Sequence, residues 1–347
     1  MLDGGLLPVA ASASVHVCRW LVMPRYLVLY PLLAAMMGIS VGGSDAGFLP
    51  ALQMPSGFVK VDFIGNGPAA APSSTPADQS KYCAGVTFQR NYKYSDNDSD
   101  VLDVATAGST EADPSDEPSH PVLLFVTGES FAEEGDNSDV IAALEDQALC
   151  FATHNGMIGV KVKYRMAPKF PWPAATQDVA AAISWAHENI DLFGGNPNEI
   201  IVIGYFAGAF HVADLLAHRE FQDRDSVIAG AVLLSGIYDL KADAGAPERA
   251  YFGDDASKYG EQSAYPGILN IDTPILLAWS ALDPPLLVAQ GEELKKRLCS
   301  SPTQCPRTTV LKDGNGLLSA FGLDASSDGL TGPTLELIRE IEARGLP

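Results

Sequence analysis

The sequence has 347 residues, a length that allows either two or three small domains or one large α/β unit. Its 22 Lys and Arg residues against 43 Asp and Glu residues give a net charge of −21, which repels phosphate backbones and anionic lipid headgroups. We therefore expect no nucleic-acid partner and no electrostatic adhesion to membranes. Hydrophobic residues make up 47% of the chain, which is typical of a compact globular protein and excludes global disorder.

The N-terminal segment has the pattern of a secretory signal. Arg19 and Arg25 precede an apolar run at residues 26–41, and small residues suited to cleavage follow. The alternative is an uncleaved anchor, because the run is close to the ~18 residues that indicate a membrane-spanning helix. Met23 is a second candidate start. We predict a signal region at residues 1–46, a secreted protein, and no membrane contact after cleavage.

Four cysteines remain after such cleavage: Cys83, Cys150, Cys299 and Cys305. Four cysteines allow three pairings, and an oxidising compartment favours disulfides over thiols. The short loop between Cys299 and Cys305 makes this pair the first choice, which leaves Cys83 with Cys150; unpaired thiols are the alternative. Neither a CxxC pattern nor a Cys/His cluster indicates zinc, so we expect no metal and no cofactor.

Two polar stretches precede the regular part of the chain. Residues 47–80 are rich in Gly, Pro, Ala and Ser and are predicted to be an extended leader. The alternation of Asp96, Asp98 and Asp100 resembles a calcium loop but lacks its Gly and its distant Glu, so we predict a solvated acidic turn. Within it, Asn97-Asp98-Ser99 matches the acceptor pattern for N-glycosylation, which matters only after export.

From residue 81 to residue 347, short apolar runs alternate with segments of helical periodicity. Five runs are predicted to be strands buried on both faces: residues 122–128, 158–164, 200–204, 229–236 and 274–280. Four segments are predicted to be helices: residues 139–154, 178–193, 207–221 and 286–298. This alternation predicts one α/β domain with a mainly parallel sheet and helices on both faces.

Two segments of this domain are specific enough to suggest a family. Residues 164–185 read YRMAPKFPWPAATQDVAAAISW, and residues 193–200 read FGGNPNEI. They resemble segments of the hormone-sensitive-lipase-like carboxylesterases, over a match that covers roughly residues 80–345. The resemblance implies a single-domain α/β-hydrolase fold with four catalytic features in chain order: an oxyanion loop, a nucleophilic Ser in a G-x-S-x-G elbow, an Asp and a final His.

The elbow and the oxyanion loop both depart from the pattern of that family. The elbow reads Gly204-Tyr205-Phe206-Ala207-Gly208, so the nucleophile position holds Phe206, whose side chain has no oxygen. The only literal G-x-S-x-G lies at residues 38–42, inside the signal's apolar run. The oxyanion loop reads TGESF at residues 127–131. Glu129 replaces a glycine there, and its carboxylate would repel developing negative charge.

The acid position is retained and the base position is not. Asp283 follows the apolar run 274–280 and matches the family's acid, whereas Gly316 stands where the final His belongs. The six histidines are His16, His120, His154, His187, His211 and His218, so none of them follows Asp283. His187, His211 and His218 are expected to be helix-surface or packed imidazoles. The Ser-His-Asp mechanism therefore lacks its nucleophile and its base.

The first hypothesis is a catalytically inactive homologue that binds a ligand at the vestigial active-site pocket. The pocket is expected at the carboxyl ends of the strands, with Phe206 as an apolar floor. Its other predicted lining residues are Gly128, Glu129, Ser130, Tyr205 and Ala207. Because Glu129 and Asp283 are acidic, we expect a neutral or cationic small-molecule or protein ligand; neither its identity nor the oligomeric state follows from the sequence.

Two alternatives stay open. One is an ester-hydrolase-family enzyme, or a lyase or isomerase, that works without the usual triad and uses polar groups such as Tyr205, Ser280 and Asp283. The other is an ordinary esterase with an altered sequence. The elbow allows a test, because a strained backbone at this turn costs ~1–3 kcal/mol. The hypothesis of an inactive homologue predicts that the backbone of Phe206 is relaxed or that its ring is buried. A positive φ with an exposed ring would contradict it.

Overall fold

The computed structural model describes residues 81–108, 120–128, 130–132, 138–222, 227–300, 305–312 and 329–344, with residues 138–144 described only as backbone. All of them belong to one compact unit, Gly57–Pro347. The predicted signal region, the leader and their boundaries lie outside the described residues and stay predictions. Among the described residues, no helix combines the length and the apolar character that a bilayer crossing needs.

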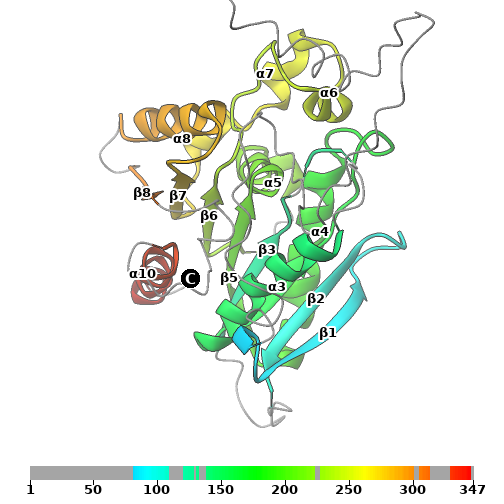
Figure 1. Ribbon diagram of the computed structural model, residues 1–347, viewed down its shortest axis with the longest axis vertical. Helices are drawn as coiled ribbons and strands as arrows, with labels where there is room; N and C mark the ends of the chain where they lie inside the picture. The colour runs from blue at the N-terminus through cyan, green and yellow to red at the C-terminus, as the bar shows by residue number, and fades with distance from the viewer. Residues whose placement is uncertain are drawn as a thin grey trace, which may run out of the picture. The chain divides into compact units, whose positions relative to one another are not determined.

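The core of this unit is an eight-stranded sheet with the order β1-β2-β4-β3-β5-β6-β7-β8 (Figure 1). The strands are β1 Val86–Lys93, β2 Val101–Ala107, β3 His120–Val126, β4 Ile158–Val162, β5 Gly195–Tyr205, β6 Gly230–Leu234, β7 Ile275–Ser280 and β8 Arg307–Leu311. From β4 to β8 all neighbours are parallel. Each of the five predicted strands is present, so the prediction of a mainly parallel α/β sheet is confirmed.

The edge formed by β1 and β2 was not predicted. β1 pairs antiparallel with β2, and β2 pairs antiparallel with β4. β2 has the sequence VLDVATA, in which Asp103 interrupts the apolar run. Asp103 is nevertheless 3% exposed, because it lies 2.8 Å from the Arg90 guanidinium and 3.6 Å from the Lys161 ammonium. Burying this carboxylate is tolerable only because it is paired, a condition that the sequence alone does not reveal.

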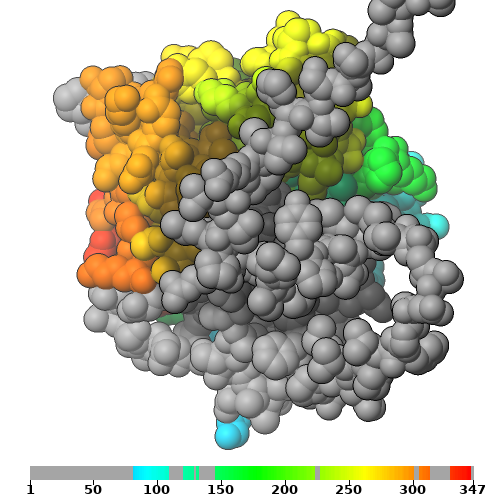
Figure 2. Space-filling model, turned by 45° about the horizontal axis from the view of Figure 1, so that its top comes forward, coloured from blue at the N-terminus to red at the C-terminus, as the bar shows by residue number. Residues whose placement is uncertain are grey.

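The helices connect and cover the strands. The α-helices are α3 Ser138–His154, α4 Ala174–Asn189, α5 Ala207–Ala217, α6 Ala246–Phe252, α7 Tyr259–Gln262, α8 Pro285–Leu298 and α10 Thr331–Arg344. Four short 3-10 helices lie at Ile190–Phe193, Arg219–Phe221, Ala256–Lys258 and Gly267–Asn270. Figure 2 shows α8, in orange, and the segment around α7, in yellow, at the surface. The four predicted helices correspond to α3, α4, α5 and α8.

Alternate residues of β3 pack against different helices, as the period of a strand requires. Val122, Leu124 and Val126 of β3 join one core cluster, which includes side chains of α4, α5 and α8. Leu123 and Phe125 join a second cluster, which includes side chains of α3 and α10. Burial on both faces explains why β3 is almost continuously apolar.

Both predicted disulfides are present. Cys83 is bonded to Cys150, which joins the segment before β1 to α3 across 67 residues of sequence. Cys299 is bonded to Cys305, which joins the end of α8 to the start of β8 across 6 residues. The alternative of unpaired thiols is therefore wrong for these four cysteines. Both bonds fit a protein that folds in an oxidising compartment.

The predicted solvated turn between β1 and β2 is only partly right. Asp96 and Asp98 are exposed. Asp100 is 1% exposed, because its carboxylate accepts a hydrogen bond of 2.6 Å from the Ser95 hydroxyl and lies 3.7 Å from the Arg165 guanidinium. The expectation was wrong for Asp100, since a paired carboxylate can be buried where three alternating acids suggest a solvated surface.

Candidate functional site

The sharp turn after β5 has the geometry expected for an elbow. β5 ends at Tyr205 and α5 begins at Ala207, so Phe206 alone makes the turn, with φ 47° and ψ −109°. Its amide donates a hydrogen bond of 3.0 Å to the carbonyl of Leu234, and its carbonyl accepts one of 3.2 Å from the amide of Phe210. The turn is thus held by β6 on one side and by α5 on the other.

Gly204 and Gly208 allow strand and helix to approach closely at this turn. A Cβ at Gly204 would lie 2.4 Å from the carbonyl oxygen of Gly208. A Cβ at Gly208 would lie 2.3 Å from the carbonyl oxygen of Val126 and 2.4 Å from that of Thr127. These obstacles are backbone atoms and cannot give way, which is the physical reason for both glycines of the sequence pattern.

Phe206 keeps a strained backbone and buries its ring. A non-glycine residue at positive φ costs ~1–3 kcal/mol. The residue is 5% exposed, and burial of a Phe side chain stabilises by about 1.5–3 kcal/mol, which offsets that strain. The expectation that burial of the ring would accompany a strained elbow is confirmed.

The ring of Phe206 belongs to what we call the aromatic cluster, a set of buried rings at the elbow. Its members are Phe131, Tyr164, Phe206, Phe210, His211, Tyr251 and Phe252. Phe131 lies at its centre, with ring centroids 6.0 Å from Phe206, 5.5 Å from Phe210 and 5.2 Å from Phe252. The space beside the turn is therefore filled with aromatic side chains.

His211 is the one imidazole in this cluster. It is fully buried, and neither of its ring nitrogens has a hydrogen-bond partner among the described residues. Its neighbours are rings, with centroids 4.7 Å away for Tyr164 and 5.2 Å away for Tyr251. Burial lowers the pKa of His211 to about 3, so the imidazole is neutral near pH 7. The predicted packed imidazole is confirmed here.

The predicted oxyanion loop lies against the elbow. A Cβ at Gly128 would lie 1.8 Å from the carbonyl oxygen of Tyr205, so only glycine fits there. Ser130 is 5% exposed, and its hydroxyl accepts a bond of 3.4 Å from the amide of Ala132, a local loop contact. The structure thus places Gly128 against the elbow and buries Ser130 in the loop that follows, whereas Glu129 lies outside the described residues.

Asp283 lies just beyond the carboxyl end of β7, and its partner is a serine. Its Oδ2 accepts a bond of 2.6 Å from the Ser235 hydroxyl and one of 2.8 Å from the Ser280 amide. Burial is the largest influence on the pKa of Asp283 and raises it, while the hydrogen bond from Ser235 opposes that rise. Burial raises the pKa of the Tyr205 hydroxyl, and the negative charge of Asp283 raises it further.

The sequence analysis missed Ser235. It follows β6 with φ 53°, and its amide donates a bond of 2.8 Å to the carbonyl of Ala278. The residue is 1% exposed. A Ser-Gly pair directly after an apolar strand indicates a turn, which was the only available signal. Nothing in the spacing shows that this serine binds an acid 48 residues away.

Two further site residues predicted from the sequence, Ala207 and Ser280, are buried and have structural roles. Ala207 is fully buried as the first residue of α5. Ser280 is fully buried, and its hydroxyl accepts a bond of 3.0 Å from the Leu282 amide within the turn that holds Asp283. Gly316 lies outside the described residues. In the part of the chain that the structure describes, no group of three or more His, Cys, Asp or Glu residues is placed to hold a metal ion.

His218, at the end of α5, makes a separate polar cluster. Its Nδ1 lies 2.8 Å from Asp214 Oδ1, and its Nε2 lies 3.2 Å from the carbonyl oxygen of Glu261. The hydrogen bond to Asp214 is the largest cause that raises the pKa of His218 to about 9. Asp214 also accepts bonds of 3.0 Å from the Trp172 indole and 2.6 Å from the Thr176 hydroxyl. With both nitrogens engaged, His218 fastens α5 to α7.

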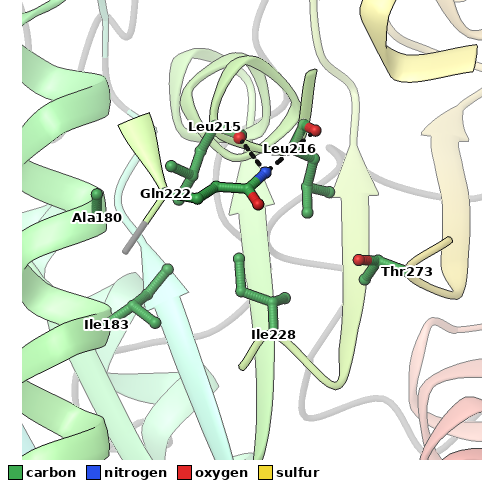
Figure 3. A pocket seen from close by; sticks show the side chains of 7 residues that line it. All are labelled: Ala180, Ile183, Leu215, Leu216, Gln222, Ile228 and Thr273. Atoms are coloured by element: carbon green, nitrogen blue, oxygen red, sulfur yellow. Dashed lines mark hydrogen bonds between the residues drawn. The ribbon is translucent and has the colours of Figure 1, made fainter. Parts of the chain in front are cut away.

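Figure 3 shows one pocket formed by described residues. Its cavity volume is about 70 Å³, and it is lined by Ala180, Ile183, Leu215, Leu216, Gln222, Ile228 and Thr273. Ile228 and Thr273 precede β6 and β7, so this pocket lies at the amino ends of these strands. The ligand pocket predicted from the sequence lies at the carboxyl ends of the strands, so the observed pocket is not the predicted one.

Comparison with known proteins gives a consistent picture. A sequence model of the alpha/beta hydrolase fold matches residues 140–294. Esterase LipC of Mycobacterium tuberculosis is 29% identical over 72% of this chain and 63% of its own length. The chain thus spans less than two thirds of that relative. Crystal protein of Dictyostelium discoideum is 28% identical over 40% of this chain and 25% of its own length.

Solved structures share the fold at low sequence identity. Esterase B from Lactobacillus rhamnosis superposes with a TM-score of 0.60 at 13% identity, over 77% of this chain and 93% of that protein. A bacterial heroin esterase superposes with a TM-score of 0.55 at 20% identity, over 75% and 85% respectively. At these identities the likenesses show the fold alone.

Proposed function

We propose that this chain, which has the α/β-hydrolase fold and resembles esterase- and lipase-like proteins, is a homologue without serine-hydrolase catalysis that binds a ligand at the carboxyl edge of its sheet. The observation that carries this proposal is Phe206. It occupies the turn between β5 and α5, where the family's pattern has the nucleophile. A phenyl ring cannot attack an acyl carbon.

The surroundings of Phe206 support the loss of catalysis. Its ring packs with Phe131 in the aromatic cluster. If a nucleophile stood at this turn, a substrate's acyl group would have to occupy the space that these rings fill. Among the described residues, His211 is the imidazole that contacts this cluster, and neither of its nitrogens has a hydrogen bond to a hydroxyl or a carboxylate. A general base needs such hydrogen-bond contact with the group that it deprotonates.

The partner of Asp283 supports the same conclusion. In a triad the acid accepts a hydrogen bond from the imidazole and orients it. Here Asp283 accepts a hydrogen bond from the Ser235 hydroxyl and not from an imidazole. The sequence has no histidine between Asp283 and Pro347. Asp283 thus has a structural role in the turn after β7, and this role does not require a triad.

The ligand that we propose is neutral or cationic and carries an apolar part. Leu282 and Leu286 flank Asp283 and are 64% and 47% exposed. An apolar surface therefore borders a half-buried carboxylate, and exposed apolar residues beside a polar group are typical of binding sites. Glu129 would add a second negative charge if it lies at the same edge, as its sequence position predicts. An anionic ligand would be repelled.

Secretion is part of the proposal. Both disulfides fit an oxidising compartment, and the N-terminal segment matches a secretory signal in sequence. The proposed protein thus binds its ligand outside the cytosol or within the secretory pathway.

A second candidate function is supported by Ser235 alone. This residue combines a positive φ, an unusual conformation that occurs at functional sites, with a hydroxyl 2.6 Å from a carboxylate that could accept its proton. An esterase that uses a Ser235–Asp283 pair would need the hydroxyl to be reachable. Because Ser235 is 1% exposed, we place this candidate second.

Hydrolysis of short-chain p-nitrophenyl esters tests the proposal. Purified natural chain is compared with Asp283→Asn, Ser235→Ala and a Phe206→Ser/Gly316→His double variant. We expect no turnover by the natural chain above that of Asp283→Asn, and a gain only in the double variant. Steady turnover by the natural chain that Asp283→Asn abolishes would overturn the proposal. Loss of that turnover in Ser235→Ala as well would establish the second candidate.

Binding is tested with hexanol, hexylamine and hexanoate, which share one apolar chain and differ in charge. We expect a saturable increase in melting temperature with the alcohol or the amine, reduced by Asp283→Asn. The matched control is Asp243→Asn, a change in the loop between β6 and α6. A shift only with hexanoate, or one that Asp243→Asn reduces equally, would contradict the proposed ligand class.

A further inference from the structure

The turn between β1 and β2 contains a modification motif that the proposed function does not use. Asn97-Asp98-Ser99 is the only Asn-X-Ser or Asn-X-Thr triplet without proline at X in the 347 residues. The pattern is the acceptor signal for N-linked glycans in exported proteins. Asn97 is therefore the one candidate acceptor for an N-linked glycan in this sequence.

The conformation of the turn leaves this asparagine ready for modification. The amide and the hydroxyl of Ser99 both donate to Asn97 Oδ1, over 3.2 and 3.0 Å. Among the described residues no hydrogen bond engages Asn97 Nδ2. Both donors thus engage the oxygen of the carboxamide, and the nitrogen, which is the atom that forms the glycosidic bond, is left outside these contacts. The hydroxyl that the motif requires is thus the one that contacts the acceptor amide.

The turn is also accessible. Asp98 and Ser99 are exposed, and Asn97 is half-buried. The side chain of Asp98 is 94% exposed and pairs with Lys93 at the end of β1. The backbone is anchored, because the amide of Asn97 donates 3.0 Å to Ser95 Oγ and its carbonyl accepts 3.2 Å from the amide of Asp100. A transferase can therefore reach a motif whose conformation is already defined.

The chemistry requires a donor that the secretory pathway supplies. Asn97 Nδ2 forms a bond to the anomeric carbon of an oligosaccharide carried on a polyprenyl diphosphate. The bond between that carbon and the diphosphate oxygen breaks, the polyprenyl diphosphate leaves, and one proton departs from the amide. No oxidation or reduction takes place. The two disulfides support passage through the compartment where such donors occur.

A glycan at this position would stand at the edge of the sheet that contains the elbow. β2 runs antiparallel to β4, and Leu102 pairs with Val162 at the carboxyl end of β4. The turn before β2 therefore lies at the carboxyl edge of the parallel strands. Three strand spacings separate β2 from β5, or ~15 Å at ~4.8 Å each. A glycan there borders the surface on which a large ligand would approach the elbow.

From these observations we infer that Asn97 carries an N-linked glycan in the exported protein. The test expresses the full chain in a eukaryotic secretory host and measures electrophoretic mobility before and after treatment with peptide N-glycosidase. Asn97→Gln and Ser99→Ala remove the acceptor and its hydroxyl. Ser99→Thr preserves the motif, and Asn198→Gln changes an asparagine outside any motif.

We expect a mobility shift on enzyme treatment for the natural chain, Ser99→Thr and Asn198→Gln, and none for Asn97→Gln or Ser99→Ala. Mass spectrometry should locate an Asn-to-Asp conversion at position 97 in most of the treated protein. Natural chain recovered without a glycan, from the medium or from the cells, would overturn the inference. A shift that persists in both Asn97→Gln and Ser99→Ala would do the same. The inference rests on the secretion that is part of the proposed function, but the ester assay measures catalysis alone, so a missing glycan and unexpected ester turnover are distinguishable results.

Discussion

The buried imidazole of His211 makes a specific prediction about acid stability. Its pKa is about 3 in the folded protein because of burial, against an ordinary value of 6.5. The unfolded chain therefore binds a proton that the folded chain does not, and stability falls as the pH falls from 6.5 towards 3. At ~1.4 kcal/mol per pH unit, a decrease of about two units below 6.5 costs about 3 kcal/mol through this residue alone.

His211→Phe should remove this dependence. Phenylalanine keeps a planar ring among Phe131, Phe210 and Tyr251 and has no nitrogen to protonate. Its extra ring atom can shift the whole stability curve by overpacking, but that shift does not depend on pH. The assay is urea unfolding of both proteins from pH 7 to pH 4, with His154→Gln, which removes an exposed histidine, as the control. Equal pH dependence of the free energy of unfolding in the natural chain and in His211→Phe would refute the reasoning.

Three other predictions concern stability. Gly208→Ala places a Cβ 2.3 Å from a backbone carbonyl oxygen and should cost about 3 kcal/mol or more in urea unfolding, whereas Gly260→Ala, which meets open space, should cost less than about 1 kcal/mol. The pKa of His218 is raised to about 9, so its stabilisation is complete below pH 6.5 and is lost as the pH rises through about 9. His218→Gln should therefore cost about 1–2 kcal/mol below pH 6.5, after allowance for its partial exposure, and the two unfolding curves should converge above pH 9. Replacing both cysteines of the Cys83–Cys150 bond by Ala should cost about 4 kcal/mol, against about 2 kcal/mol for the Cys299–Cys305 bond, because their loops span 67 and 6 residues; equal losses would contradict loop closure as the cause.

The sequence predicted those features that depend on local pattern. Continuous apolar runs predict strands buried on both faces, and β3 to β7 have that burial. The two glycines of the elbow predict a close approach of strand and helix, which Gly204 and Gly208 make. The short spacing of Cys299 and Cys305 also favoured the correct pair. In each case the physical cause acts between neighbours in the chain.

The features that were missed depend on partners far apart in sequence. β1 and β2 contain charged residues that are stable only as pairs across strands, as between Arg90 and Asp103. The aromatic cluster joins rings from the loop after β3, from α5 and from α6, and no spacing indicates that they meet. The bond from Ser235 to Asp283 connects the ends of β6 and β7 in the same way. Such contacts become visible only once the sheet order is known.

Covalent labelling by an alkyl fluorophosphonate, read by intact mass, tests the central claim most directly. The reagent modifies a serine only where a site has activated it, so it reports the nucleophile without a choice of substrate. We expect the purified natural chain to form no adduct under conditions in which an active serine esterase is labelled completely. A stoichiometric adduct on the natural chain, at Ser235 or at any other serine, would contradict the claim that this protein has lost its acyl-transfer chemistry.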